Sequence, residues 1–439
     1  MRHFWQLSLA LTLFSPAADA QIRLPVLPVL SRPLNAVDQS LDEVGSRSLA
    51  ALSELRSVQV AHMIRSNPKT VDVDDHGNPV VRSEVLALSP SESALRSAAA
   101  LHYVVLREQT MEGMGIEVVV LGAPSGLSTK KALRQLRAAD PGGTYDFNHI
   151  YTGSGIIDES AARSPDTSAA AAGANSPAAA TSEQRVRVGL VDSGIDTGHG
   201  AFKHATVHAF GCGARLVPDE HGTAVASLMV GQAEQFHGVR PDAELFAADV
   251  YCGLPTGGAV DAVADALAWL VRERVPVINV SLVGPPNAML ENVVRMVIAR
   301  GHVVVAAVGN DGPAAPPLYP ASYPDVVGVT AVDVHQRALL EACRGKQVKF
   351  SAPGADMSAA NPAQSYAVVR GTSFASPIVA GLLAEAVRAP DKAAAQRAVA
   401  DLAARAVDLG APGPDPVYGF GLVGGDLRPE LALVGSRSN

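Results

Sequence analysis

The sequence predicts an α/β fold with a mainly parallel sheet and helices on both faces, preceded by a small α+β module. After about residue 185, runs of valine, isoleucine and alanine alternate with amphipathic helical patterns. This alternation is typical of a parallel sheet that is buried on both faces. An Ala/Ser-rich stretch, 160–184, contains no Val, Leu, Ile or Phe and separates this part from the N-terminal one. The stretch cannot bury a core, so we interpret it as a linker.

The first twenty residues are typical of a secretory signal peptide. A mostly apolar stretch, 4–14, follows Arg2, and small residues at 18–20 offer a cleavage position. The apolar stretch is too short to span a bilayer as a helix. We therefore expect an exported protein, either periplasmic or extracellular, with no membrane span after removal of the signal.

Residues 21–159 form the expected N-terminal module. Its predicted elements are, in order, a helix over about 38–64, two extended runs around the turn at 75–79, two strands around 111–115, a helix that begins at Ser128 or Thr129, and a strand over 144–151. This part of the sequence shows no cluster of catalytic residue types.

Residues 185–430 form the expected main domain, and 431–439 a tail. Its predicted elements are, in order, a strand (185–194), a helix (221–231), a strand (243–252), a helix (257–274), a strand (275–284), a helix (287–301) and a strand (302–310). Ligands of such sheets lie at the carboxyl ends of the strands. Asp192, Ser281 and Asn310 stand at those ends and are therefore candidate site residues.

Composition excludes some classes of function. The net charge of −8 and an aromatic content of only 5% argue against a nucleic-acid partner. The 12 histidines show no HExxH motif or close Cys/His cluster, so we expect no metal site of that kind. Cys212 and Cys252 either form a disulfide or remain buried thiols, and Cys343 is left over; the sequence leaves both alternatives open.

Two further residues complete a candidate site. His221 opens a helical pattern, and Ser373 lies at the start of another, in "RGTSFASPIVAG" (370–381). A serine hydroxyl becomes a good nucleophile only with a base, and the base needs a group that orients it. Asp192, His221 and Ser373 supply these three roles within one domain, although any one of them alone is more often a turn or packing residue.

Four segments of the chain together resemble the signature segments of the subtilisin-like serine proteases (subtilases, peptidase family S8). They are "VDSGID" (191–196), "HGTAVAS" (221–227), "AAVGNDG" (306–312) and "GTSFASPIVAG" (371–381). The resemblance covers nearly all of 185–430, with Asp, His and Ser in the family's order. It implies a subtilisin-like three-layer domain with Ser373 as nucleophile, His221 as general base and Asp192 as its orienting partner. It also implies that Asn310 and the Ser373 N–H stabilise the oxyanion.

The resemblance also implies where a peptide would bind. One edge of the groove would be formed by Ser281, Leu282 and Gly284, and the wall of the pocket for the residue before the cut by Ala307 and Gly309. Leu318 stands at the floor of this pocket, where many relatives have glycine, so we expect a shallow pocket for small or medium apolar side chains. Many relatives bind structural calcium, and the resemblance leaves such a site open, but the sequence shows no calcium ligand set and indicates no other cofactor.

The segment 127–151 resembles the end of the pro-domains that precede subtilisin-like proteases. The resemblance implies that the module assists folding and blocks the groove, as an intramolecular chaperone or inhibitor. The predicted function is thus an exported serine endopeptidase that is made as a zymogen and acts on polypeptides. The alternative is a peptide-binding or self-processing-only relative that its own module keeps inactive.

Overall fold

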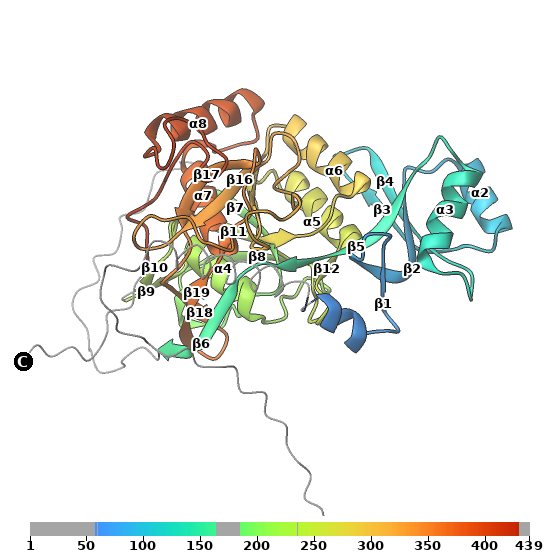
Figure 1. Cartoon of the computed structure of the whole chain (residues 1–439), viewed down its shortest axis with the longest axis horizontal. Coiled ribbons are helices and arrows are strands. Elements are labelled where there is room, and N and C mark those ends of the chain that lie inside the picture. The colour runs from blue at the N-terminus through green and yellow to red at the C-terminus, as the bar shows by residue number, and fades with distance from the viewer. Residues whose placement is uncertain (1–57, 59, 164–184, 235, 430–439) are drawn as a thin grey trace, which may run out of the picture. The chain divides into compact units, whose positions relative to one another are not determined.

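The C-terminal part is built on a seven-stranded parallel sheet. The computed structural model describes residues 58, 60–163, 185–234 and 236–429 (Figure 1). The strand order is β17 (Val348–Pro353), β16 (Val327–Val332), β15 (Val303–Ala307), β13 (Val277–Val280), β7 (Arg187–Asp192), β11 (Glu244–Asp249) and β8 (Thr206–Phe210). Each pair of neighbouring strands in this sheet is parallel, which confirms the predicted fold class.

Helices cover both faces of this sheet, as the continuous apolar runs predicted. One core contains residues of α4 (Glu220–Val230), α7 (Thr372–Ala386) and α8 (Lys392–Arg405), and the other those of α5 (Val260–Arg272) and α6 (Ala288–Ala299). On β15, Val303 and Val305 belong to the first core and Val304 and Ala306 to the second. Side chains alternate along a strand, so a strand that is buried on both faces is apolar at nearly every position.

The N-terminal module contains an antiparallel sheet with two helices on one face. Its strands are β1 (Val71–Val73), β2 (Pro79–Leu88), β3 (Val104–Met111), β4 (Ile116–Gly122) and β5 (Thr144–Gly153), and its helices are α2 (Glu92–Ala100) and α3 (Thr129–Ala139). On β4, Val119 and Leu121 join the core with the module's helices, whereas Val118 and Val120 join the core that holds α5 and α6. The module therefore packs its second face against the C-terminal part.

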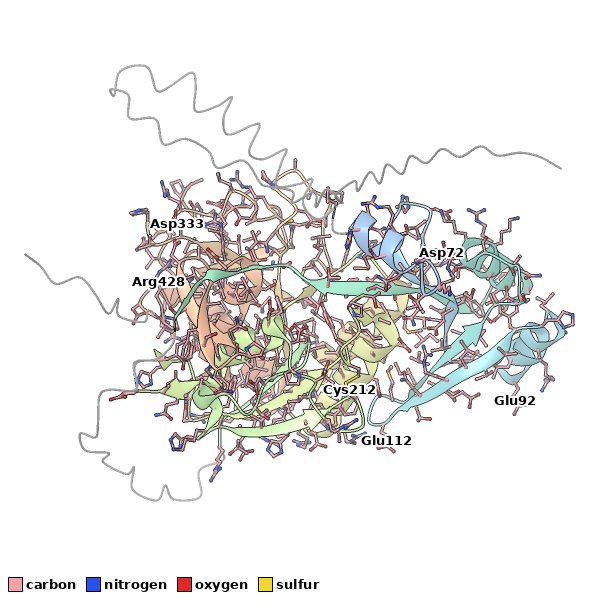
Figure 2. The ribbon with its side chains drawn as sticks, turned by 90° about the horizontal axis from the view of Figure 1, so that it is seen from below. Asp72, Glu92, Glu112, Cys212, Asp333 and Arg428 are labelled. Carbon is pink, nitrogen blue, oxygen red and sulfur yellow. A yellow bond between two sulfur atoms is a disulfide. The ribbon has the colours of Figure 1, made fainter. Side chains whose placement is uncertain are left out.

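The strand β5 extends from the module onto the C-terminal part. It pairs there with two short strands, β12 (Gly258–Ala259) and β14 (Leu282–Val283), in the same antiparallel sheet. The next strand, β6 (Ile156–Arg163), pairs with β19 (Ser365–Arg370), which also pairs with β18 (Met357–Asn361). Figures 1 and 2 both show this ribbon running from the module along the C-terminal part.

The sequence did not predict every element. The helix α2 was missed because it buries only Ala94 and Ala98, which gives almost no apolar periodicity. The strand β6 runs into the predicted linker, whose remainder (164–184) lies outside the described residues. The signal segment, most of the helix predicted over 38–64 and nearly all of the tail also lie outside them, so the proposed domain boundaries stay predictions. Among the described residues, no helix has the length and apolarity needed to cross a membrane.

Candidate active site

Three neighbouring strands deliver polar residues to one edge of the parallel sheet. Asp192 is the last residue of β7, Ser281 follows β13, and Asn310 lies three positions beyond the end of β15. These strands are adjacent in the order β15-β13-β7. The carboxyl ends of parallel strands lie together, and the structure brings these three predicted residues to the same edge.

Asp192 and His221 form a buried hydrogen-bonded pair. Asp219 caps α4 and accepts a hydrogen bond from the His221 backbone N–H, which places the imidazole at the start of the helix. The Nδ1 atom of His221 lies 2.7 Å from Oδ1 of Asp192, whose residue is 0% exposed. Burial alone would lower the pKa of His221, but the charge and hydrogen bond of Asp192, with the charge of Asp219, raise it above the ordinary value.

Ser373 lies at the positive end of the buried helix α7. Gly371, which precedes this helix, has φ of 142°, in the region that favours glycine. The Ser373 hydroxyl donates to the Ser281 carbonyl at 3.1 Å and accepts from the Ser154 N–H at 3.2 Å. The Nε2 atom of His221 is buried and has no hydrogen-bond partner. The serine hydroxyl is therefore held by Ser281 and not by His221 in this structure.

The side-chain amide of Asn310 is oriented by the backbone before Ser373. Its Oδ1 accepts from the Thr372 N–H at 3.1 Å, which leaves Nδ2 buried without a hydrogen-bond partner. A Cβ built on Gly371 would lie 2.8 Å from this Nδ2 and 2.9 Å from the carbonyl oxygen of Ser154. The Nδ2 donor of Asn310 and the carbonyl oxygen of Ser154 thus lie against the same glycine, Gly371.

The predicted groove residues serve two different purposes. Leu282 pairs with Gly153 of β5, so this edge holds an extended peptide. The Ser281 side chain instead donates to the Ser373 carbonyl oxygen at 3.0 Å and accepts from Asn279, so its hydroxyl is bonded within the C-terminal part. Gly284 is bonded to Tyr319 through two backbone hydrogen bonds of 2.9 and 3.0 Å.

The pocket-wall residues lie close together. Ala307 ends β15 and is 0% exposed, and Gly309 follows it with φ of 100°. The Cδ1 atom of Leu318 occupies the space in which a side chain on Gly309 would lie. Leu318 is itself buried, so the structure places a leucine side chain against this wall.

Two parts of the groove were missed by the sequence analysis. The second edge is β12, which pairs with Ile150 and Tyr151 of β5 on the other side of the peptide. Next to it, the hydroxyl of Tyr251 accepts a hydrogen bond from the Gly153 N–H at 2.7 Å. The only signal for this edge was the Gly-Gly pair before α5, which is too common to identify a binding strand.

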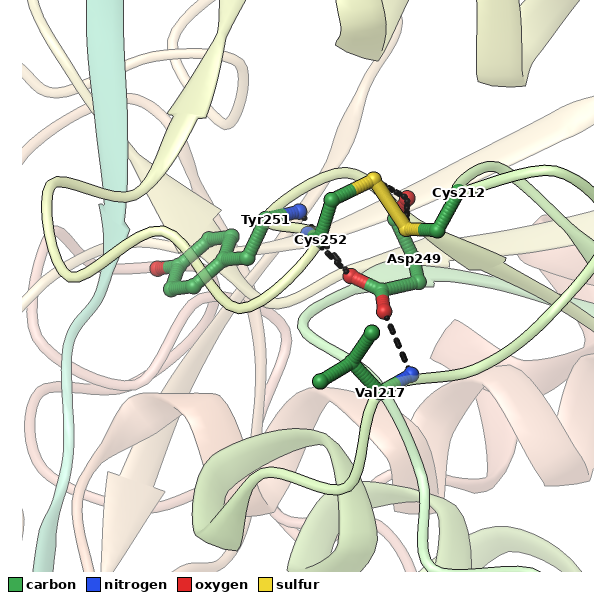
Figure 3. Close-up of a disulfide and its surroundings, with 5 residues drawn as sticks. All are labelled: Cys212, Val217, Asp249, Tyr251 and Cys252. Carbon is green, nitrogen blue, oxygen red and sulfur yellow. Dashed lines mark hydrogen bonds between the residues drawn. A yellow bond between two sulfur atoms is a disulfide. The ribbon is translucent and has the colours of Figure 1, made fainter.

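A disulfide links two loops beside this second edge. Cys212 follows β8 and Cys252 follows β11, and the structure joins them, which resolves the alternatives that the sequence left open (Figure 3). Beneath the bridge, the carboxylate of the buried Asp249 accepts hydrogen bonds from the N–H groups of Tyr251, Cys252 and Val217. Cys343 is buried and lies outside the bridge.

The two cysteines of this bridge and Asp249 are the one group of three potential metal ligands among the described residues. Both sulfurs are bonded to each other and the carboxylate is satisfied by backbone donors, so the cluster does not fit a metal ion in this oxidised form.

We expect removal of the disulfide to lower stability. The bridge closes a sequence separation of 40 residues, for which chain entropy predicts a contribution of about 4 kcal/mol. Replacing Cys212 and Cys252 with serine should lower the free energy of unfolding by about this amount, measured by denaturant unfolding in a Ser373→Ala chain that cannot digest itself. Reducing the bridge in the Ser373→Ala protein should give the same loss, and an unchanged midpoint in both would contradict the prediction.

Comparison with known proteins places this geometry in a family. Residues 183–421 match the Subtilase family, Peptidase_S8. Subtilisin Savinase from Lederbergia lenta is 36% identical over 210 residues, which cover 45% of this chain and 75% of that protein. M-protease from Shouchella clausii (strain KSM-K16) is 36% identical over 210 residues, which cover 45% of this chain but only 53% of that protein.

A solved structure supports the fold. Fervidolysin from Fervidobacterium pennivorans, a keratinolytic enzyme related to subtilisin, superposes with a TM-score of 0.64 and 20% sequence identity, covering 81% of this chain and 62% of its own. The family match extends over more than half of the present chain and includes Asp192, His221, Asn310 and Ser373. The chain therefore belongs to the subtilase family.

Proposed function

We propose that the chain is an exported serine endopeptidase that is made as a zymogen. The observation that carries this proposal is the convergence of the Asp192–His221 pair, Ser373 and Asn310 on one peptide bond of the chain itself, Ser154–Gly155. Strand β5 pairs with the groove up to Gly153, and β6 pairs on the other side from Ile156 onward. Between the paired segments, the Ser373 hydroxyl contacts the N–H and hydroxyl of Ser154, and the Ser154 carbonyl oxygen and Asn310 Nδ2 lie against the same glycine, Gly371.

The residues support acyl transfer to Ser373. Rotation of its hydroxyl away from Ser281 toward His221 would let Nε2 accept the proton as the oxygen attacks the substrate carbonyl. Asp192 keeps the His221 proton on Nδ1 and stabilises the imidazolium that forms. The negative charge on the carbonyl oxygen would be stabilised by Asn310 Nδ2 and the Ser373 N–H at the positive end of α7.

Collapse of this intermediate breaks the peptide bond. The leaving nitrogen takes the proton from His221, and the carbonyl carbon remains as an ester on Ser373. A water molecule then gives its proton to His221 and attacks the ester, which releases the acid and restores the hydroxyl. In the first half of the reaction His221 carries the Ser373 proton to the leaving nitrogen, and in the second half it carries a proton from water back to Ser373. The same three residues therefore serve both halves.

The module supports the zymogen part of the proposal. Its strand β5 occupies both edges of the groove, so another polypeptide cannot bind there until this strand leaves. A cut between Ser154 and Gly155 would break the covalent link but would leave the pairing of β5 in place. The module would thus act as an intramolecular inhibitor after the first cut. The disulfide agrees with export to an oxidising compartment, and the segment 1–20 with a signal peptide.

The pocket supports a preference for small side chains before the cut. Leu318 fills space beside Gly309, and the residue that the chain itself presents before the proposed cut is Ser154. Replacing Leu318 with alanine should open the pocket and raise kcat/KM for peptides with phenylalanine before the cut, relative to alanine, by about tenfold or more. Peptide cleavage kinetics measure this ratio, and a ratio equal to that of the unsubstituted protein would show that Leu318 points away from the substrate.

A self-processing-only protein is the alternative, and the full occupation of the groove by β5 favours it. The test is to express the full chain and treat it with a fluorophosphonate probe, before and after incubation. A reactive peptidase should carry the label on Ser373 after incubation, hydrolyse an unfolded protein, and yield a fragment that begins at Gly155. Fragment formation without hydrolysis or labelling would favour the alternative. An uncut, unlabelled and inactive chain would refute both.

A further inference from the structure

A cavity lies at the amino edge of the parallel sheet, away from the candidate active site. Its volume is about 270 Å³. The first residues of β15 and β16, Val303 and Val327, line it, together with Lys349, the second residue of β17. Because these strands are parallel, their amino ends lie at the edge opposite to the one that holds Asp192 and Asn310. The cavity therefore shares no residue with the candidate active site.

A buried histidine lines this cavity and has one ring nitrogen to spare. His302 is only 3% exposed, and its Nδ1 lies 2.6 Å from the carbonyl oxygen of Val275. A carbonyl oxygen can only accept, so the ring carries a proton on Nδ1. Among the described residues, Nε2 has no hydrogen-bond partner. Burial, with the charges of Arg274 and Arg300, lowers the pKa of His302 although the bond to Val275 opposes this, so the ring is neutral and Nε2 offers a lone pair.

The charged side chains around the cavity are mostly positive. Lys349 and Lys392 both line it, and neither forms an ion pair with another described residue. Asp325 is the one carboxylate among the described lining residues, so two lysines and one aspartate give the lining a net charge of +1, whereas the chain carries −8. Lys392 is exposed and Lys349 half-buried, so the positive charge lies nearer to solvent than the His302 ring. A cavity with this charge attracts an anion to its mouth.

The walls of the cavity are apolar and are held in place by backbone hydrogen bonds. Three side chains from different segments form them: Ile298, Val399 and Phe420. The Asp391 N–H donates to the Gly301 carbonyl oxygen at 3.1 Å, which fixes the start of α8 against the start of β15. The Phe420 N–H donates to the Lys349 carbonyl oxygen at 2.8 Å, which fixes Phe420 beside β17. The space between the positive mouth and the histidine is therefore preformed and suits an apolar body.

We propose that this cavity binds a small carboxylic acid that has an apolar ring and a hydrogen-bond donor at the far end, such as a phenolic acid. The carboxylate lies between the ammonium groups of Lys349 and Lys392, where charged hydrogen bonds hold it. The ring packs on Phe420, and the phenol hydroxyl donates to Nε2 of His302. A ligand that lacks the hydroxyl leaves Nε2 buried without a donor. This site lies outside the groove and does not depend on the peptidase function.

The first test titrates 4-hydroxyphenylacetate into the full Ser373→Ala chain by calorimetry. Binding should saturate with a Kd of about 1 mM or lower. Phenylacetate lacks the hydroxyl and 4-hydroxyphenylethanol lacks the carboxylate, so each should bind more weakly by about fivefold or more. Equal affinity for all three compounds, or no saturation with 4-hydroxyphenylacetate up to about 10 mM, would overturn the proposal.

The second test locates the ligand with variants of the same chain. In His302→Asn, the amide can still donate to the Val275 carbonyl, but the acceptor of the ligand is lost, so the affinity should fall by about five- to tenfold. Lys349→Met should lower it by a similar factor. Lys346→Met removes an exposed lysine outside the cavity and should leave the affinity unchanged. Thermal unfolding midpoints show which variants fold, and the three compounds decide the question for any that do not. Unchanged affinity in both His302→Asn and Lys349→Met would place the ligand elsewhere and overturn the proposal.

Discussion

Replacing Ser373 with alanine should lower kcat for peptide hydrolysis by about a millionfold and leave the chain uncut between Ser154 and Gly155. Without the hydroxyl, His221 has no nucleophile to activate, and the Asn310 amide can only stabilise the slow attack of water. In the uncut chain β5 also stays paired with the groove edges β12 and β14, so peptide hydrolysis falls through the blocked groove as well as through the missing nucleophile. Initial rates on peptides, and mass spectrometry of the chain after expression, measure both effects.

A matched control lies on the same helix. Ser376 is also 0% exposed, and its hydroxyl lies 3.0 Å from that of Ser281. Replacing Ser376 with alanine removes one buried hydroxyl from α7 but no nucleophile, so kcat should fall by less than about tenfold. If the Ser373→Ala chain kept activity within tenfold of the unsubstituted protein, Ser373 would not be the nucleophile and the proposed mechanism would be wrong.

The parts of the fold that were predictable depend on local sequence. A strand that is buried on both faces is apolar over most of its length, as in the buried run 188–191 that precedes Asp192. The end of such a run marks the carboxyl edge of the sheet, so Asp192 and Asn310 could be assigned to one site before their distances were known. Ser373 could be added because a serine at the start of a buried helix is followed by small residues that allow close packing.

The parts that were not predictable depend on contacts between distant residues. The Tyr151 hydroxyl donates to the carbonyl oxygen of Pro285, which lies 134 positions away, and no local pattern indicates this contact. The edge Gly258–Ala259 is only two residues long, too short for an alternating pattern. The Cys212–Cys252 bridge could only be named as an alternative, because spacing does not determine pairing.

Replacing Asp192 with asparagine should lower kcat by about 10⁴ while leaving the fold in place. The carboxylate accepts a hydrogen bond from the Nδ1–H of His221, with 2.7 Å between Nδ1 and Oδ1, and so leaves the free lone pair on Nε2 for the serine. The asparagine amide is nearly the same size but can donate to Nδ1. This favours the tautomer with its proton on Nε2, which cannot act as a base toward Ser373. Rates at saturating peptide, with the thermal unfolding midpoint as the test of folding, measure the effect.

The same substitution should move the acid limb of the pH profile to lower pH. The base must be neutral, so activity is present above the pKa of His221 and is lost as the pH falls through it. Asp192 raises this pKa through its charge and hydrogen bond, and Asp219 contributes a smaller charge effect. The residual kcat/KM of the Asp192→Asn protein should therefore persist to lower pH than that of the unsubstituted protein, and an Asp219→Asn protein should show a smaller shift in the same direction. An acid limb at the same or higher pH in the Asp192→Asn protein would show that this carboxylate does not control the ionisation of His221.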